Sequence, residues 1–449
     1  MPGLMFGTGG LALYALVYTM LLSPLIMIFL PRLRDVAAKH GLITAADYVR
    51  ARHGSHPLAL ATALTGILAT MPYLGLQVVG MTAVLRSLGL APDGLAGCVV
   101  LTLLFLVFAV ATHPGGLRAC VRMSVVKALL IGGAVVVVLI LTVARLGPPG
   151  HVFDLADRRS DAMGQPFDIP AHSFTAYATL AVGSALAQLV YPQVLLVATA
   201  SRSKQSLRAA TNFLPAWSMS LGLWAFFGVA ALAAGVRTPA GHGELAVPAL
   251  VGRIAPDWLA GPVFGALAVA GLLPAVVMAM SMSMLFIRNI YVEYLNPTAT
   301  PAHEVRAARG PALAIMAGAV AFALFMKPQD AINLHLLGGV WILQTFPSVA
   351  VSLFTRWFHQ RALFTGWAVG MLAGTALLGM HGFSSVVDIG IGPVHAPVYV
   401  AVTALALNLV VAAALTPVLD ALGVPRGRDC TADDGAWERR GSKYTFVVH

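Results

Sequence analysis

Three of the most apolar stretches of the sequence carry polar side chains at the spacing of one helix face. Residues three, four or seven positions apart share a face of an α-helix. The three stripes are Thr70, Tyr73 and Gln77 beside Pro72; Ser184, Gln188 and Tyr191 before Pro192, with Gln193 directly after it; and Trp341, Gln344 and Ser348 beside Pro347. Amide and hydroxyl groups of this kind can hold a small carboxylate or another polar solute.

Two interpretations fit such a stripe. The side chains can join neighbouring helices by hydrogen bonds, or they can line a water-accessible cavity near the middle of a membrane. Either interpretation accounts for one stripe alone, but several proline-interrupted polar stretches together favour a shared cavity, which is typical of a transporter. The candidate substrate contacts are Thr70, Tyr73, Gln77, Tyr191, Gln193, Trp341 and Gln344.

The ionisable residues argue against an enzyme. All 18 Asp and Glu residues fall outside the long apolar stretches, and His335 is the only histidine clearly within one. The sequence contains no HExxH motif and no P-loop, and His53 and His56 stand beside Arg50 and Arg52, which disfavour a metal cation. We therefore expect no catalytic residues, no metal site and no organic cofactor.

Composition predicts a polytopic membrane protein that is all α-helical. Hydrophobic residues make up 58% of the 449 residues, charged residues only 10%, and the mean hydropathy is +0.83. A soluble domain carries roughly 25% charge, and a helix needs roughly twenty apolar residues to cross a bilayer. Eleven spans are predicted, at 11–30, 58–84, 95–112, 125–144, 174–198, 214–234, 258–286, 311–326, 331–354, 363–379 and 397–419.

The basic residues predict the orientation of these spans. Alternate connections, beginning with 31–57 and ending with the C-terminal tail, hold 21 of the 28 Lys and Arg residues. Loops rich in Lys and Arg stay in the cytoplasm, so the N-terminus is predicted outside and the C-terminus inside. The formal charge of +10 therefore reflects the excess of Lys and Arg in the cytoplasmic loops. Its expected partner is anionic lipid rather than nucleic acid.

The chain is predicted to hold one folded unit. Residues 1–426 form the transmembrane domain, and residues 427–449 are polar, of mixed charge and too few for a core, so we expect a disordered cytoplasmic tail. The first span runs directly into a charged segment, which predicts that it stays in the membrane rather than being cleaved as a signal peptide.

The span 258–286 and the loop after it lead to a family resemblance. Pro274 interrupts this span, and Ser281 and Ser283 place hydroxyls within it, where they can bond their own helix or face an ion. The segment LPAVVMAMSMSMLFIRNIYVEYLNP resembles the eighth core helix of the sodium:solute symporter family, in its monocarboxylate-permease branch. Segments that resemble the same branch in the same order include ITAADYVRARHGS, ALTGILATMPYLGLQVVGM, GSALAQLVYPQ, LLGGVWILQTFPSV, GWAVGMLAGT and LNLVVAAALTPVLDALG.

The resemblance implies a leucine-transporter-like inverted-repeat helical bundle and a symporter for small monocarboxylates or related organic acids and amino acids, placed in the bacterial inner membrane. It implies coupling to Na⁺ or H⁺: Ala279 and Met280 stand where the family's cation site has Ser or Thr, and Ser281 and Ser283 are displaced substitutes for those ligands. The opening MPGLMFGTGG resembles the end of the first core helix, so we expect most of that helix to be missing and the chain as written not to transport by itself. A sensor or regulatory membrane module and an integral-membrane enzyme are the alternatives.

Overall fold

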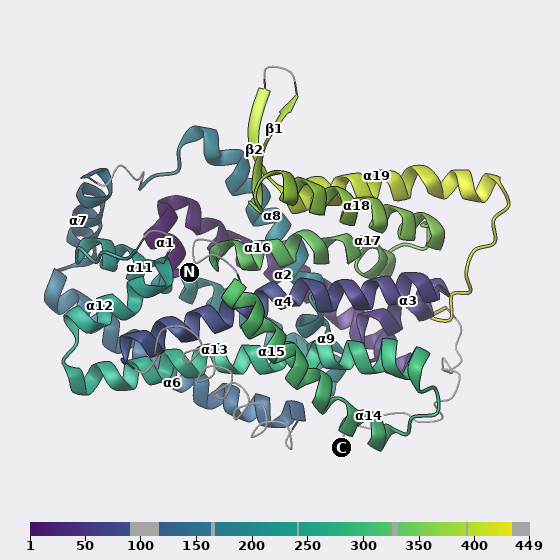
Figure 1. The fold of residues 1–449 in the computed structure, drawn as a ribbon, viewed down its shortest axis with the longest axis horizontal. Coiled ribbons are helices and arrows are strands. Elements are labelled where there is room, and N and C mark those ends of the chain that lie inside the picture. Colours follow the sequence, from purple (N-terminus) through teal and green to yellow (C-terminus); the bar gives the residue numbers. More distant parts are fainter. Residues whose placement is uncertain (90–115, 163–166, 240–241, 326–330, 392–393, 433–449) are drawn as a thin grey trace.

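The computed structural model of the chain describes residues 1–89, 116–162, 167–239, 242–325, 331–391 and 394–432. Within these residues the fold is a helical bundle with one two-stranded hairpin, and most long helices run along the longest axis of the molecule (Figure 1). The fold class predicted from composition, an all-α membrane protein, is confirmed.

Nine helical segments in the described residues are long and apolar enough to cross a membrane. They match nine of the predicted spans, whereas the predicted span 311–326 is a helix of 17 residues and 95–112 lies outside the described residues. The nine segments are Pro2–His40, His56–Ser87, Ala119–Leu146, Ala171–Val190, Lys204–Ala233, Asp257–Leu295, His335–Leu353, Gln360–Met380 and Val400–Ala421. The chain is therefore a multi-pass membrane protein.

The individual elements begin and end as follows. In the first half, the helices are α1 (Pro2–Thr8), α2 (Tyr14–His40), α3 (Ala45–His53), α4 (His56–Ser87), α6 (Gly116–Leu146), α7 (Pro149–Ala162), α8 (Phe174–Val190), α9 (Pro192–Ala200) and α10 (Lys204–Thr211). In the second half, they are α11 (Leu214–Ala233), α12 (Ala246–Ile254), α13 (Asp257–Phe286), α14 (Pro301–Ala307), α15 (Arg309–Phe325), α16 (Ala331–Ile342), α17 (Phe346–Val349), α18 (Gln360–Met380) and α19 (Val400–Ala421).

The predicted interruption at Pro192 separates α8 from α9. Tyr191 has extended backbone angles (φ −62°, ψ 139°), and Pro192 occupies the first turn of α9. A proline disfavours helical angles at the residue before it and suits the first turn of a new helix. The break leaves the C-terminal carbonyls of α8 and the N-terminal amides of α9 without helical partners in the middle of the bundle.

Two further irregular segments follow the polar stripes. After α16, Leu343–Thr345 tightens into a 3₁₀ turn before Pro347 in the first turn of α17. Earlier in the chain, α13 continues through Pro274 and passes into a π-helix over Ile287–Leu295. Single π-turns are rare in proteins and occur often at functional sites.

A β-hairpin was not predicted. Strands β1 (Val386–Ile391) and β2 (Val394–Tyr399) pair in antiparallel fashion, and β2 runs directly into α19. The predicted span 397–419 therefore begins within a strand. Apolar residues of β2 and α19 follow one another without a polar break, so hydropathy alone placed the boundary too early.

The bundle ends in a buried charge cluster beside α3. Asp47 is 0% exposed, and its carboxylate accepts hydrogen bonds from Nε of Arg288 at 3.1 Å and from the Asn289 amide at 2.9 Å. Thr44 and Asp47 also form a reciprocal capping box at the start of α3. The short helix α3 is thereby fixed to the π-helical end of α13.

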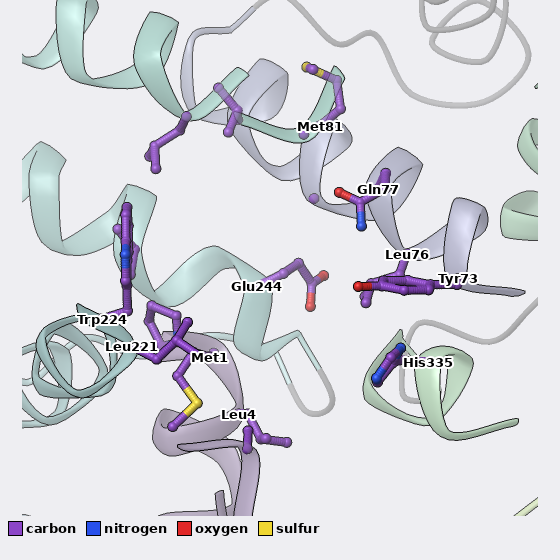
Figure 2. A pocket seen from close by; sticks show the side chains of 18 of the residues that line it. Met1, Leu4, Tyr73, Leu76, Gln77, Met81, Leu221, Trp224, Glu244 and His335 are labelled. Atoms are coloured by element: carbon purple, nitrogen blue, oxygen red, sulfur yellow. The ribbon is translucent and has the colours of Figure 1, made fainter. Parts of the chain in front are cut away.

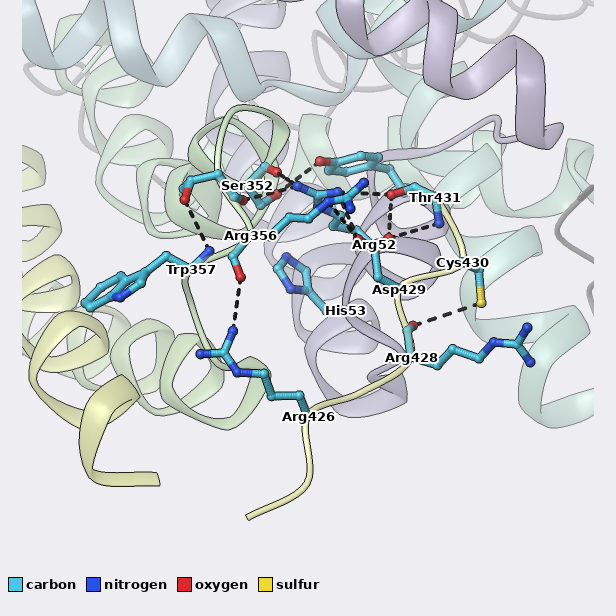
Figure 3. A network of polar contacts seen from close by, with 12 residues as sticks. Arg52, His53, Ser352, Arg356, Trp357, Arg426, Arg428, Asp429, Cys430 and Thr431 are labelled. Atoms are coloured by element: carbon cyan, nitrogen blue, oxygen red, sulfur yellow. Dashed lines mark hydrogen bonds and ion pairs between the residues drawn. The ribbon is translucent and has the colours of Figure 1, made fainter. Parts of the chain in front are cut away.

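The first residues of the predicted tail pack against the same helix. Asp429 pairs with Arg52 at 3.0 Å and with Arg356 at 3.3 Å, as Figure 3 shows, and the Cys430 amide donates to the Ala51 carbonyl at 2.8 Å. Asp429 therefore pairs with basic side chains from two distant segments, and the disordered tail expected over 427–449 stays a prediction. Residues 433–449 lie outside the described part of the chain.

Segments predicted to share the cytoplasmic side meet at one end of the molecule. Arg34 donates to the Arg202 carbonyl at 2.7 Å, and Arg50 pairs with Glu293. Together with the contacts of Asp429, these bonds link five of the connections that carry most of the basic residues. Their proximity supports the alternation on which the predicted topology is based.

The orientation itself is testable by cysteine labelling. In a background without Cys98, Cys120 and Cys430, we expect Asp157→Cys to react with an impermeant thiol reagent from the periplasm and Gln205→Cys to be protected. Both positions are exposed, so access depends on the side of the membrane. Labelling of Gln205→Cys but not of Asp157→Cys from the periplasm would reverse the orientation.

The Asp47 cluster predicts a large loss of stability for a small change. Asp47→Asn removes the charged partner of the buried Arg288 guanidinium on α3 but leaves Glu304 at 3.6 Å from it, so we expect a cost of about 1–3 kcal/mol. We expect a clearly lower melting temperature in detergent. Asp35→Asn is the matched control, because Asp35 is 43% exposed in its ion pair with Lys204 and surface pairs contribute little. Equal shifts for both variants would contradict the assignment.

Candidate functional site

A cavity of about 470 Å³ opens where α1, α2, α4, α11, α13 and α16 meet the loop before α12. Figure 2 shows side chains from these elements converging on it. Its polar and aromatic lining consists of Tyr14, Tyr18, Tyr73, Gln77, Trp224, Glu244 and His335. Concave sites with apolar walls and a few convergent polar groups are typical of small-molecule binding.

The polar residues of the stripe on α4 lie in two different surroundings. Tyr73 and Gln77 line the cavity, and substrate contact at these residues stays a prediction. Thr70, one turn earlier, is fully buried, and its hydroxyl donates to the Gly66 carbonyl at 2.7 Å. A threonine in a helix commonly satisfies its hydroxyl in this way. Of the three residues, Tyr73 and Gln77 are thus placed to contact a solute.

Tyr191 occupies the break between α8 and α9. Its ring lies 5.5 Å from the Tyr73 ring, centroid to centroid, and its buried hydroxyl has no hydrogen-bond partner among the described residues. Gly338 on α16 allows this approach, since a Cβ atom there would lie 2.6 Å from the Tyr191 hydroxyl. A buried phenol without a partner carries a free-energy cost and is a natural donor for a ligand.

His335 completes the group, although its site role was not predicted. Its ring lies 4.3 Å from Tyr73, 6.2 Å from Tyr191 and 6.4 Å from Tyr18. The sequence held a signal for it, because a lone ionisable residue inside a membrane span is a functional candidate by default.

The third stripe joins helices and does not line the cavity. Nε1 of Trp341 donates to Thr375 on α18 at 3.1 Å. The Gln344 side chain donates to the Val340 carbonyl at 2.9 Å, while the Asn408 amide on α19 donates to the Gln344 side-chain oxygen at 3.2 Å. These contacts correspond to the interhelical interpretation of the stripe.

Gln193 lines a second cavity. This space of about 380 Å³ lies between α2, α6, α9, α10, α11 and α13, and Lys127, Thr211 and Pro274 also line it. Both polar atoms of the Gln193 amide lack a hydrogen-bond partner among the described residues. Gln193 is two residues beyond Tyr191, but the two side chains lie in different surroundings on opposite sides of the helix break.

The three candidate cation residues are all buried in α13. The Ser281 hydroxyl donates to the Met278 carbonyl at 2.8 Å, and the Ser283 hydroxyl donates to the Ala308 carbonyl at 2.6 Å. Ala279 is 1% exposed and offers no side-chain ligand. A hydroxyl that donates its hydrogen retains its oxygen lone pairs, so both serines keep the capacity to coordinate a cation.

A membrane bundle with an interrupted helix beside a polar cavity is the arrangement of a secondary active transporter. Comparison with known proteins agrees: residues 1–374 match the sodium:solute symporter family, and the chain belongs to that family. It is 37% identical to the monocarboxylate transport permease protein of Rhizobium johnstonii, over 94% of this chain and 84% of that protein. The chain is therefore a secondary active symporter.

Two further proteins are similar to this chain over most of its length. The uncharacterized symporter YodF of Bacillus subtilis is 27% identical over 83% of this chain and 73% of its own length. A Na⁺-coupled sialic acid symporter, solved in a substrate-bound outward-open state, has the same fold with a TM-score of 0.69. That alignment covers 93% of this chain and 85% of the symporter at 16% identity, so it shows the fold alone.

Substitutions of Gln77 and Gln344 test which of the two residues contacts substrate and which holds helices together. Gln77→Leu removes a polar contact in the cavity, which should weaken apparent substrate affinity by about 1–3 kcal/mol and leave the melting temperature nearly unchanged. Gln344→Leu should lower the melting temperature and leave the apparent substrate affinity nearly unchanged, because Asn408 loses a buried hydrogen-bond acceptor. Uptake kinetics and thermal unfolding, measured on both variants, separate the two roles. An unchanged affinity in Gln77→Leu would make that residue part of the scaffold.

Proposed function

We propose that the chain couples Na⁺ entry to uptake of small monocarboxylates or related solutes, such as lactate, pyruvate or alanine, across a bacterial inner membrane. The observation that carries the substrate class is the 37% identity with a monocarboxylate transport permease over 94% of the chain. The family and the Na⁺-coupled structural neighbour support Na⁺ as the coupling ion.

The substrate contacts in this proposal are Tyr73, Gln77, Tyr191 and His335. Their phenol, amide and imidazole groups can donate hydrogen bonds to a carboxylate, and among the described residues no Lys or Arg side chain lines this cavity. The N-terminal amides of α9 add partial positive charge next to Tyr191. Neutral donors bind an anion loosely enough for release, as a carrier requires.

The cation region of the proposal is the segment of α13 that holds Ala279, Ser281 and Ser283. Hydroxyl and carbonyl oxygens are suitable ligands for a hard monovalent cation, and the helix is continuous here. We expect Ser281→Ala and Ser283→Ala to raise the Na⁺ concentration required for half-maximal uptake. If the Na⁺ dependence of uptake were unchanged in both variants, the cation would bind elsewhere.

The charge carried across the membrane limits accumulation. A tenfold Na⁺ gradient supplies about 1.4 kcal/mol, and a potential of 100 mV supplies about 2.3 kcal/mol for each net charge moved. One Na⁺ with one monocarboxylate moves no net charge, so the potential contributes nothing. One Na⁺ with a zwitterion moves one charge, and both terms drive its uptake.

Uptake into proteoliposomes tests the proposed function. We expect an inward Na⁺ gradient to drive accumulation of labelled lactate, pyruvate or alanine, and an equal K⁺ gradient to drive none. The 449-residue chain is compared with a chain extended upstream by about sixty residues, so that the expectation about the first core helix is tested in the same assay. Accumulation that is independent of the Na⁺ gradient in both chains would overturn Na⁺ coupling.

A further inference from the structure

The second cavity, which Gln193 lines, also contains a charged side chain. Lys127 lies on α6 within the membrane span Ala119–Leu146, and it lines both this cavity and a neighbouring one of about 510 Å³ between α6 and α11. It is the only charged residue among the described residues that line the two cavities. In the described part of the chain, no hydrogen bond or ion pair joins its ammonium group to another residue.

An ammonium group at this depth is costly without a partner. Lysine residues within membrane spans normally pair with an opposite charge or with other polar groups. The lining of both cavities in the described chain includes no Asp or Glu residue. Because the Lys127 side chain carries three hydrogen-bond donors and no acceptor, an anionic ligand satisfies it best.

Gln193 presents further donors to the same cavity. It follows Pro192 in the first turn of α9, and both polar atoms of its amide are buried without a hydrogen-bond partner among the described residues. The N-terminal amides of α9 add partial positive charge beside it. A carboxylate has two oxygens, so it can accept hydrogen bonds from the ammonium of one helix and from the amide of the other.

The rest of the lining is largely apolar. It includes Leu30 on α2, Leu207 on α10, and Leu273, Val277 and Met278 on α13. Each CH₂ group of a ligand that is buried against such a wall strengthens binding by about fourfold. Lactate and pyruvate offer little more than a methyl group, whereas a longer alkyl chain covers more of the wall.

The two cavities lie next to the lipid-facing surface of the bundle. Phe213 and Trp217 line the neighbouring cavity and are 75% and 53% exposed, and Leu129 on α6 is 73% exposed. Exposed apolar side chains on a multi-pass membrane protein contact lipid chains. An amphiphilic anion dissolved in the bilayer can therefore reach Lys127 without passing through the candidate substrate cavity.

We propose that Lys127 and Gln193 bind the carboxylate of a monocarboxylate with an apolar chain, such as octanoate, and that the chain lies against the apolar wall of the second cavity. This site is separate from the candidate substrate cavity, because the two share no described lining residue. The inference goes beyond the proposed function, which concerns small solutes at the other cavity. It gives Gln193, a predicted substrate contact, a longer carboxylate as its ligand.

Binding of octanoate to the purified chain in nanodiscs of zwitterionic lipid tests this assignment. Calorimetry with empty nanodiscs as the blank separates binding by the protein from partitioning into lipid. We expect octanoate to bind at least about tenfold more tightly than butyrate, because its longer chain buries more CH₂ groups. Lys127→Gln should weaken octanoate binding at least about tenfold through loss of a charged hydrogen bond, whereas Lys127→Arg should keep most of it.

Arg122→Gln is the matched control, because Arg122 is an exposed cation on α6 that lines neither cavity. It should leave octanoate binding unchanged, and thermal unfolding checks that every variant is folded. No octanoate binding above the blank, or equal binding of butyrate and octanoate, would overturn the assignment. Equal octanoate affinity in Lys127→Gln and the unaltered chain would do the same, and would mean that the ammonium only extends toward the lipid headgroups.

Competition experiments distinguish the other possible ligands of this cavity. Displacement of octanoate by excess lactate would place octanoate in the candidate substrate cavity. Loss of octanoate binding in nanodiscs that contain phosphatidylglycerol would assign the second cavity to an anionic phospholipid. We expect neither result, because the site is separate from the substrate cavity and its ligand is a single-chain carboxylate.

Discussion

The lack of water in the bilayer core is the constraint on which this structure depends, because each polar group at that depth needs a partner within the protein. Most spans meet it through regular helical hydrogen bonds. At Tyr191 and Pro192 the chain cannot, since the proline and the extended angles before it end one helix and begin another. The unpaired groups at this break lie beside aromatic side chains that have free hydrogen-bonding capacity of their own.

The same constraint sorts the polar stripes into two kinds. Gln344 and Asn408 bond each other from different helices, so their polarity holds α16 to α19. The Tyr191 hydroxyl and His335 Nδ1 have no partner among the described residues, and their polarity is available to a solute. A polar side chain whose hydrogen bonds are made within the protein stabilises the helix packing. One that lacks a partner next to a cavity can bind a solute. The sequence spacing is the same for both kinds.

Most charged side chains lie at the ends of the bundle, and Lys127 on α6, which lines the second cavity, is an exception. At the predicted cytoplasmic end, Asp47 and Asp429 tie α3 to the π-helical end of α13 and to the C-terminal segment through buried or half-buried pairs. On the opposite side, Glu244 faces a cavity with no Lys or Arg side chain among its described lining residues. The Asp47 and Asp429 pairs stabilise the connections between helices, and the Glu244 carboxylate lies 2.8 Å from Nδ1 of His242.

The sequence by itself determined the class of protein, the nine described spans and the break at Pro192. It also predicted substrate contacts at Tyr73 and Gln77, which line the cavity, and at Tyr191, whose ring lies 5.5 Å from the Tyr73 ring. These follow from hydropathy and helical spacing, which are local properties. Only the tertiary structure decided that Thr70, Trp341 and Gln344 are satisfied elsewhere, that 427–432 pack on α3, and that His335 and Glu244 join the cavity. Those outcomes depend on contacts between residues far apart in the chain, such as Gln344 with Asn408, and no local pattern records which distant side chain will satisfy a polar group.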